Sequence, residues 1–331
     1  MAFDGITTAN ITKQLQETLT GGRIYKIAQP ESDELLLTIK NNGTQYRLLL
    51  SADASLPLVY LTQTNKPGPM TAPGFCMLLR KHLQNARIAA VSQPGLERVI
   101  HLHLEHLNEL GDLCRKKLII EIMGKHSNII FCDDKDMIID SIKHISGIVS
   151  SVREVLPGRS YFLPLTQEKA DPLLYAEKDG DTAPLTWEDF KIHMLSKPMP
   201  LYKALYSSFT GLSPIIAQEI CCRAGVDADL PAKALAETAG EPLKPVWEVF
   251  SAMMTQVAAG SFSPVIIYDG RTPLEFAALP LTLYGDKESR SFDSISEVLE
   301  HYYAERETVT RIRQKSVDLR RIVQTLSLIH I

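Results

Sequence analysis

The sequence has few cysteines and no long apolar run. Its five cysteines (Cys76, Cys114, Cys132, Cys221 and Cys222) are odd in number and form no Cys-x-x-Cys pair. This pattern argues against a disulfide framework and a structural zinc site, and it favours a reducing compartment. No stretch of about 18 apolar residues is present, so we expect no membrane-spanning helix. The N-terminus lacks a basic stretch followed by an apolar one, so we expect no secretory signal.

Signatures of common catalytic sites are also missing. No Gly-x-Ser-x-Gly, His-Glu-x-x-His or dinucleotide-binding glycine fingerprint occurs. Residues 124–127 (GKHS) are similar to the end of a phosphate-binding loop, but Ile119 stands where that loop needs its first glycine. We therefore expect no NTP site, no catalytic residue, no metal and no cofactor. Instead, the residues predict a tight turn between strands that displays Lys125 and His126, where a phosphate can reach them.

The composition is that of a globular protein with unevenly distributed charge. The chain has 331 residues, 45% hydrophobic and 22% charged, with 35 Lys and Arg against 39 Asp and Glu. This length predicts two or three domains. Residues 76–126 hold eight Lys and Arg against five Asp and Glu, whereas residues 165–245 hold eight against twelve. A local basic patch can attract nucleic acid even on an acidic protein, although ordinary scatter of surface charge gives the same counts.

Residues 1–170 are predicted to form an antiparallel α+β domain. Apolar residues recur at helical spacing from residue 11 to 19 behind Thr7 or Thr8, either of which can cap the helix. Asn41-Asn42-Gly43 between two apolar runs predicts a hairpin. A second helix is predicted over 74–84. The predicted strands span 23–29, 34–40, 44–51, 59–62, 87–92, 98–106, 113–123, 128–132 and 137–142.

An all-α, helix-hairpin-helix-like domain with a short β element is predicted over 171–290, after a linker from 156 to 181. The predicted helices span 187–194, 202–209, 214–224, 232–238 and 246–258, and residues 264–268 are the β element. Gly211-Leu212-Ser213-Pro214 before one helix is typical of the second half of a helix-hairpin-helix, whose free backbone N–H groups can bind phosphate. A plain helical connector fits the same residues.

Residues 291–331 have the spacing of a coiled-coil arm. One heptad register places the following residues at a and d positions, with Glu305 as the exception: Ile295, Val298, Tyr302, Val309, Ile312, Ser316, Leu319, Val323 and Leu326. Such a seam needs a partner helix. Because no returning helix follows, we expect the sequence to be truncated within the coiled coil and a second arm to be missing.

Two polar groupings in the basic region have more than one interpretation. His101, His103 and Glu105 alternate with leucines, so they share one face of a strand. That face can be simply solvated, can hold a metal or can contact RNA. Glu97 and Arg98 begin the same strand after a Pro-Gly turn. They can project toward one ligand, or they can merely discourage edge-to-edge aggregation.

Five segments in this order carry a resemblance that runs along essentially the whole chain. They are residues 1–5 (MAFDG), 21–24 (GGRI), 75–82 (FCMLLRKH), 121–128 (EIMGKHSN) and 140–144 (DSIKH). The chain resembles the NFACT family, which contains fibronectin-binding protein A-like proteins, bacterial ribosome quality control factors and their eukaryotic relatives. The blocks at residues 75–82 and 121–128 are long and specific enough to identify the chain as a member of that family.

The resemblance implies an N-terminal NFACT domain similar to that of formamidopyrimidine-DNA glycosylases, followed by the helical domain and the coiled-coil arm. It implies a cytoplasmic, ribosome-associated protein that binds a large ribosomal subunit (rRNA) carrying a stalled peptidyl-tRNA. It also implies recruitment of alanyl-tRNA for template-free addition of alanine to the nascent chain. Since the ribosome forms the peptide bond, the resemblance implies an adaptor and not an enzyme, with no cofactor and no membrane partner.

The resemblance also assigns tRNA binding to particular side chains. The family's Asp-Arg pair falls on Glu97-Arg98, where Glu keeps the charge and adds one methylene. Asp4 matches another acidic position of the family. Arg can bind phosphate or stack on a base, and a carboxylate can accept from a base amino group. The other cations expected to attract the tRNA are Arg80, Lys81, Lys125 and His126.

Two other functions compete with this interpretation. The older family name suggests a cell-surface adhesin that binds fibronectin, and this is the main alternative. A DNA glycosylase is disfavoured, because Ala2-Phe3 stands where those enzymes have Pro-Glu and the cysteines of their zinc finger are missing.

Overall fold

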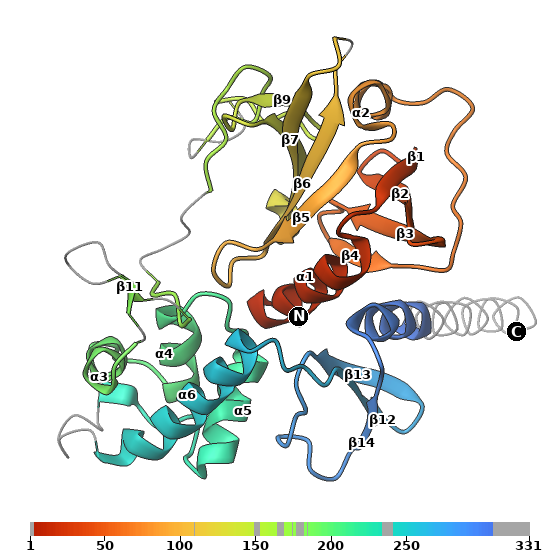
Figure 1. The fold of residues 1–331 in the computed structure, drawn as a ribbon. Helices are drawn as coiled ribbons and strands as arrows, with labels where there is room; N and C mark the ends of the chain where they lie inside the picture. The colour runs from red at the N-terminus through yellow and green to blue at the C-terminus, as the bar shows by residue number, and fades with distance from the viewer. Residues whose placement is uncertain are drawn as a thin grey trace, which may run out of the picture.

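A computed structural model of the chain describes residues 3–108, 110–148, 153–163, 169–173, 175–176, 182–183, 185–233 and 241–306. The N-terminal part is a nine-stranded antiparallel sheet in the order β4-β3-β2-β1-β5-β6-β7-β8-β9 (Figure 1). Its strands are β1 (Arg23–Glu31), β2 (Glu34–Asn41), β3 (Thr44–Ser51), β4 (Leu58–Leu61), β5 (Arg87–Ser92), β6 (Val99–Leu107), β7 (Leu113–Glu121), β8 (Asn128–Asp133) and β9 (Ile138–Ser141). The predicted antiparallel α+β class is confirmed.

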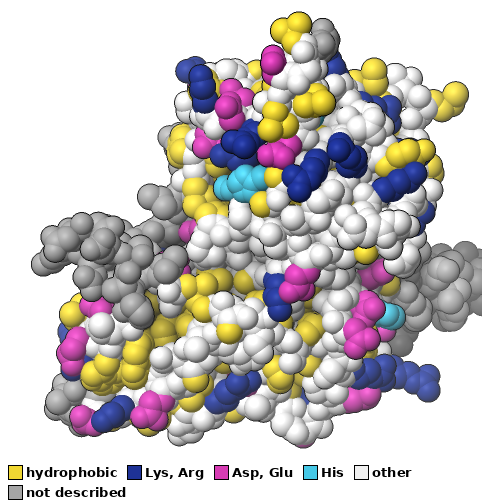
Figure 2. All heavy atoms as spheres, viewed as in Figure 1, with side chains coloured by type: hydrophobic (Ala, Val, Ile, Leu, Met, Phe, Trp, Pro, Cys, Tyr) yellow, Lys and Arg dark blue, Asp and Glu magenta, His cyan; other side chains and the backbone are white. Residues whose placement is uncertain are grey.

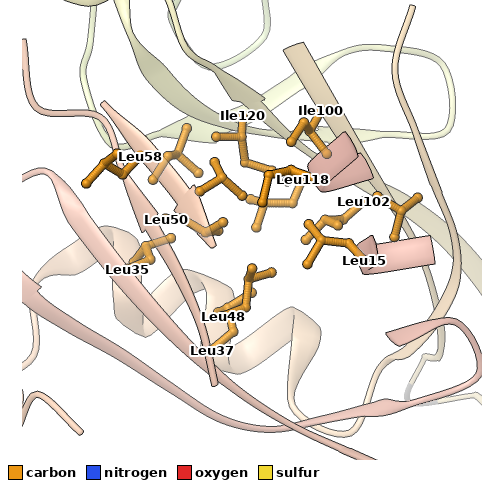
Figure 3. Packing of buried hydrophobic residues seen from close by; sticks show 14 of the residues in the cluster. Leu15, Leu35, Leu37, Leu48, Leu50, Leu58, Ile100, Leu102, Leu118 and Ile120 are labelled. Atoms are coloured by element: carbon orange, nitrogen blue, oxygen red, sulfur yellow. The ribbon is translucent and has the colours of Figure 1, made fainter. Parts of the chain in front are cut away.

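The sheet folds back on itself, so that its two halves enclose one core. β1 and β5 are joined by a single residue pair, which marks the bend between the halves. Figure 3 shows leucines of β2, β3 and β4 facing Ile and Leu side chains of β6 and β7, with Leu15 of α1 (Gly5–Leu19) among them. Helix α2 (Gly74–Leu83) packs against β1 and β6. Alternating apolar residues on each strand supply this core.

Helix α1 begins earlier than predicted and has a different cap. Its N-cap is Asp4, whose Oδ1 accepts a hydrogen bond from the backbone N of Thr7 at 2.8 Å. The expectation of a Thr7 or Thr8 cap is therefore wrong. Both threonines are buried inside the first turns of the helix. An aspartate satisfies a free backbone N–H at a helix start at least as well as a threonine.

The predicted linker from residue 156 is wrong over its first part, because residues 153–163 pack back onto the sheet. Glu121 at the end of β7 is fully buried and forms an ion pair with Arg153. Its other oxygen accepts a hydrogen bond from the Tyr161 hydroxyl at 3.0 Å. A buried carboxylate is costly unless such partners compensate it, so the segment is held against the sheet.

The central part is helical, as predicted. Its elements are α3 (Trp187–Leu195), α4 (Leu201–Ser208), α5 (Pro214–Ala224), η3 (Glu241–Leu243) and α6 (Lys244–Ala258), with a minimal β10 (Tyr175–Ala176) and β11 (Thr182–Ala183) pair before them. Phe190, Phe209 and Phe250 form its centre, with ring centroids 4.8 to 5.7 Å apart. Most of the helix predicted over 232–238 lies outside the described residues.

A three-stranded sheet in the order β13-β12-β14 follows. Its strands are β12 (Val265–Asp269), β13 (Thr272–Ala277) and β14 (Glu288–Ser291). Only β12 was predicted, so the expected all-α unit is corrected to a helical unit with a small sheet. The signal for the other two strands is weak, because β13 contains a proline and all four residues of β14 are exposed and polar.

Residues 295–306 are helical and dock on the N-terminal core. Ile295, Val298 and Tyr302, the first predicted seam positions, are buried there. The partner of the first seam residues is thus the N-terminal unit together with the small sheet, whose Phe276 ring centroid lies 4.8 Å from that of Tyr302. The seam positions from Val309 onward lie outside the described residues. Within the described part of the chain, no helix combines the length and the apolar character needed to cross a membrane.

Candidate functional site

A pocket of about 220 Å³ lies where the sheet meets the helical unit. Its walls are the start of α1 (Phe3–Gly5), the loop before β6 (Leu96–Arg98) and the turn between α4 and α5 (Thr210–Pro214), together with Met123 and Lys169. Figure 1 shows the N-terminus of α1 between the two parts. Pockets that enclose a whole small molecule are typically about 300–1,000 Å³, so this one suits a projecting part of a larger ligand.

Two glycines allow the three walls to meet. Gly5 N donates to Gly211 O at 2.9 Å. A Cβ on Gly5 would lie 2.1 Å from Leu96 O, and one on Gly211 would lie 2.5 Å from both Leu96 O and Leu96 Cβ. Gly211 also has φ of +80°, which disfavours any residue with a side chain. The close approach therefore depends on residues that are far apart in the sequence.

Two helix N-termini point toward this pocket. Asp4 caps α1 and Ser213 caps α5, and Ser213 Oγ donates to Asp4 Oδ2 at 2.7 Å. Burial raises the pKa of Asp4, although hydrogen bonds from Ser213 and Thr7 oppose the shift. The structure thus places the sequence-predicted Asp4 in the pocket wall, with its carboxylate already engaged in joining the two helix starts. The positive ends of the two helices favour an anionic group in front of them.

Glu97 and Arg98 lie in the loop that leads into β6, so they precede the strand in which they were predicted. Gln93 Nε2 fixes this loop by donating to Gly5 O at 3.0 Å and to Glu97 O at 2.8 Å. Ile122 N donates to Arg98 O at 2.8 Å, which ties the loop to the end of β7. The Arg98 side chain is exposed and Glu97 is half-buried, and both line the pocket.

Lys169 is a functional candidate that the sequence did not reveal. It lies in the stretch predicted as a linker, where a single lysine carries no pattern. Burial lowers its pKa, and the nearby Arg98 charge acts in the same direction. Burial likewise raises the pKa of Glu97, while Arg98 and Lys169 pull it down. Besides the Asp4 carboxylate, the pocket therefore holds two cations, Arg98 and Lys169, close enough to Glu97 to affect its protonation.

Lys125 and His126 do not line the pocket, but they lie close to one of its lining residues along the chain. They are exposed on η1 (Gly124–His126), between β7 and β8, so the predicted turn and its display of both side chains are confirmed. The turn directly follows Met123, which lines the pocket.

Arg80 and Lys81 are not part of the pocket. They lie on α2, where Arg80 Nε donates to Ile27 O at 2.9 Å. The helix leads into the start of β5, and Arg87 there faces Glu105 near the far end of β6. At about 3.3 Å per residue, that end lies roughly 20 Å along the strand from Arg98. The predicted set of cations thus divides into two separate groups.

His101, His103 and Glu105 share one face of β6, as predicted. Glu105 accepts from Arg87 at 3.2 Å and Arg115 at 3.4 Å, and His103 Nε2 lies 2.8 Å from Ser92 Oγ. Burial lowers the pKa of His101 to about 4 and also lowers that of His103. Both imidazoles are neutral near pH 7. Among the described residues, no group of three His, Cys, Asp or Glu is placed to hold a metal.

The chain matches the family model described as NFACT N-terminal and middle domains over residues 4–327. It is 37% identical over 326 residues to "Rqc2 homolog RqcH" of Bacillus subtilis (strain 168), and the alignment covers 98% of this chain and 52% of that protein. It is 25% identical over 296 residues to "Archaeal Rqc2 homolog aRqcH" of Methanocaldococcus jannaschii, and the alignment covers 89% of this chain and 41% of that protein. The chain thus spans about half the length of the bacterial relative.

A solved structure shares this architecture at useful sequence identity. The N-terminal part of the fibronectin/fibrinogen-binding protein from Streptococcus suis superimposes with a TM-score of 0.73 at 31% identity, covering 92% of this chain and 99% of that one. The similarity therefore extends over both the sheet and the helical unit.

Proposed function

The chain belongs to the NFACT family, and on that premise we propose that it is the RNA-binding part of a ribosome quality control factor. It binds a large ribosomal subunit that carries a stalled peptidyl-tRNA. It recruits alanyl-tRNA so that the ribosome adds alanine residues, without a template, to the C-terminus of the nascent chain. The ribosome forms each peptide bond, so this chain acts as an adaptor and works in the cytoplasm beside the ribosome. The names of the bacterial and archaeal relatives support this proposal.

The observation that carries the proposal is the pocket between α1, β6 and α5. An exposed Arg98 and a half-buried Glu97 lie beside two helix N-termini, and all of them face one small space. Arg98 binds a phosphate or stacks on an unpaired base, and Glu97 accepts from a base amino group. Asp4 positions the two helix starts. A projecting loop of tRNA fits this arrangement better than a free small molecule does.

Cations around the pocket supply the sequence-independent part of binding. Lys169 lies in the wall, and the turn that carries Lys125 and His126 directly follows Met123 of that wall. Phosphate contacts set the affinity and its dependence on salt, whereas contacts to bases set selectivity. Arg80 and Lys81 act at the other end of the sheet, so they contribute only to a second area of contact.

The test is binding of purified tRNA to the Arg98→Gln variant across a salt titration. We expect weaker binding and a log–log salt slope reduced by about 0.7–0.9, since one phosphate contact is lost. Arg271→Gln is the matched control, because Arg271 is an exposed arginine on the turn between β12 and β13. In the full-length protein, Arg98→Ala should abolish C-terminal tailing while the fold is retained. Normal alanine tails in that variant would contradict the assigned role.

The name of the solved Streptococcus suis structure favours a second candidate, a surface protein that binds fibronectin or fibrinogen. Cell fractionation separates the two. Co-sedimentation of the full-length protein with large ribosomal subunits, in a manner that depends on Arg98, supports the RNA-binding proposal. Exposure at the cell surface together with fibronectin binding that is indifferent to Arg98 supports the adhesin.

A further inference from the structure

A row of charged side chains crosses the sheet far from the pocket. Five neighbouring strands each contribute one residue, and the strand register places each residue opposite the next. The row runs Lys40 (β2), Arg23 (β1), Arg87 (β5), Glu105 (β6) and Arg115 (β7). Adjacent strands lie about 4.8 Å apart, so the row is roughly 19 Å long. It crosses the bend where the two halves of the sheet meet at the Arg23–Arg87 pair.

All five side chains lie on the outer face of the sheet. The residue next to each of the first four in its strand points into the core: Ile39, Ile24, Ile88 and Leu104. The two ion pairs that Glu105 makes, with Arg87 and with Arg115, confirm the shared face at the other end of the row. The four basic side chains are exposed. Figure 2 shows basic side chains interspersed with acidic ones across the upper part of the face in view.

The row does not serve the stability of the sheet. Arg23 stands directly opposite Lys40 on one side and Arg87 on the other, and like charges opposed across strands are destabilising. Glu105 is shared by two arginines and compensates only part of the charge. Four cations against one carboxylate leave the row positive. An external anion is the partner that relieves this repulsion.

Two of the cations are held in place before any ligand binds. Lys40 Nζ lies 3.6 Å from the centre of the Tyr25 ring, and Tyr25 is 51% exposed beside the row. Arg23 Nη1 donates to Asn85 O at 3.0 Å. Side chains that are already ordered lose less conformational entropy when a ligand arrives. The row is therefore a preorganised line of charge with an exposed aromatic ring next to it.

We propose that this row is a second RNA-binding surface, which contacts successive phosphates of an RNA strand or helix without reading its bases. The inference rests on the proposed function. A line of cations spaced across an exposed, bent face fits a polyanion with regular charges, and a neighbouring tyrosine offers a surface on which a base can stack. The row lies roughly 20 Å along β6 from Arg98. One RNA can therefore engage both places, with the pocket selecting and the row adding affinity.

The test compares tRNA binding across a salt titration for the Arg23→Gln/Arg87→Gln double variant and the unaltered chain. We expect the log–log salt slope to fall by about 1.4–1.8, because two phosphate contacts are lost. The matched control is Lys287→Gln/Arg290→Gln, which removes the same charge at one partly exposed and one exposed side chain, just before and on β14. A second variant, Glu105→Gln, removes the carboxylate of the row and should strengthen tRNA binding although it breaks two ion pairs. A merely structural role predicts the opposite.

The outcomes separate this inference from the proposed function. If the salt slope is unchanged in the double variant while Arg98→Gln still weakens tRNA binding, the row is not an RNA-binding surface, and the proposal for the pocket still stands. Poly-glutamate is tested as a second ligand. If the double variant loses poly-glutamate binding while its tRNA salt slope is unchanged, the proposal is wrong and the row instead binds an acidic protein. If the unaltered chain binds no tRNA, both proposals are wrong. Thermal melting that is unchanged or raised in the double variant, together with the reduced slope, supports the row.

Discussion

The junction beside the pocket leads to a sharp prediction about Gly211. Replacing it by alanine places a Cβ 2.5 Å from both the Cβ and the carbonyl oxygen of Leu96, and it does so at φ of +80°. Neither neighbour can give way easily, because Leu96 is fully buried and its carbonyl is backbone. The turn between α4 and α5 must therefore move away from the loop that carries Glu97 and Arg98.

Two costs add at this position. A residue with a Cβ in the left-handed region costs about 1–2 kcal/mol, and overpacking a tight contact costs a further ~1–3 kcal/mol. We expect Gly211→Ala to lower the free energy of unfolding by about 2–5 kcal/mol. Gly225 is the matched control. It caps the C-terminus of α5, the helix that begins just after Gly211, with φ of +66°, and a Cβ there meets nothing within 4 Å. Gly225→Ala should cost only about 1–2 kcal/mol.

Urea unfolding of both variants measures the difference, and tRNA binding under native conditions measures its consequence. Gly211→Ala should also weaken tRNA binding, because the shifted turn disturbs the pocket wall, whereas Gly225→Ala should bind normally. Equal losses of stability in the two variants would mean that the close approach of Gly211 to Leu96 contributes nothing. Normal tRNA binding by a destabilised Gly211→Ala chain would show that the turn between α4 and α5 does not contribute to the tRNA site.

Three further predictions concern charge. Glu219 is fully buried, and its pKa lies below the usual range because hydrogen bonds from Thr282, Arg223 and Leu283 outweigh burial. Its stabilising effect is therefore present above about pH 4.3 and is lost as pH falls through the lowered pKa. Glu219→Gln should lower the melting temperature more at pH 7 than at pH 3, and an equal loss at both contradicts this. The Lys125→Gln/His126→Gln variant should weaken tRNA binding and reduce its salt slope by about 0.7–0.9, and an unchanged slope excludes that turn. Glu97→Gln should leave the slope unchanged but broaden the set of tRNAs that co-purify with the full-length protein, as sequencing of that RNA would reveal.

Local pattern predicted most of the elements correctly. The strands β1 to β9 and the helices α2 to α6 lie within a few residues of their predicted bounds, because each has a clear hydrophobic pattern and polar or turn-forming residues separate most of them. The misses share one physical cause. β13 and β14 have no such period, and residues 153–163 pack onto the sheet through a buried Glu121 ion pair. Tertiary partners, not local preference, hold these segments.

The candidate site divides in the same way. The sequence singled out Asp4, Glu97 and Arg98, and the structure brings these into one pocket. It also singled out Lys125 and His126, which lie on the turn that follows the pocket residue Met123. The sequence grouped Arg80 and Lys81 with them because a count of charge along the chain ignores where the strands turn. It missed Lys169, whose proximity to Glu97 and Arg98 depends on how the chain returns after residue 163.

The sequence by itself determined most of the order of strands and helices, the displayed turn at residues 124–126 and the family. Those depend on periodicity and on blocks of neighbouring residues, which are local properties. Only the tertiary structure decided that the start of α1, the loop before β6 and the start of α5 share one pocket, and that four cations align across five strands. The physical reason is that both depend on close approaches and on strand register between residues far apart in the chain, which no local pattern encodes.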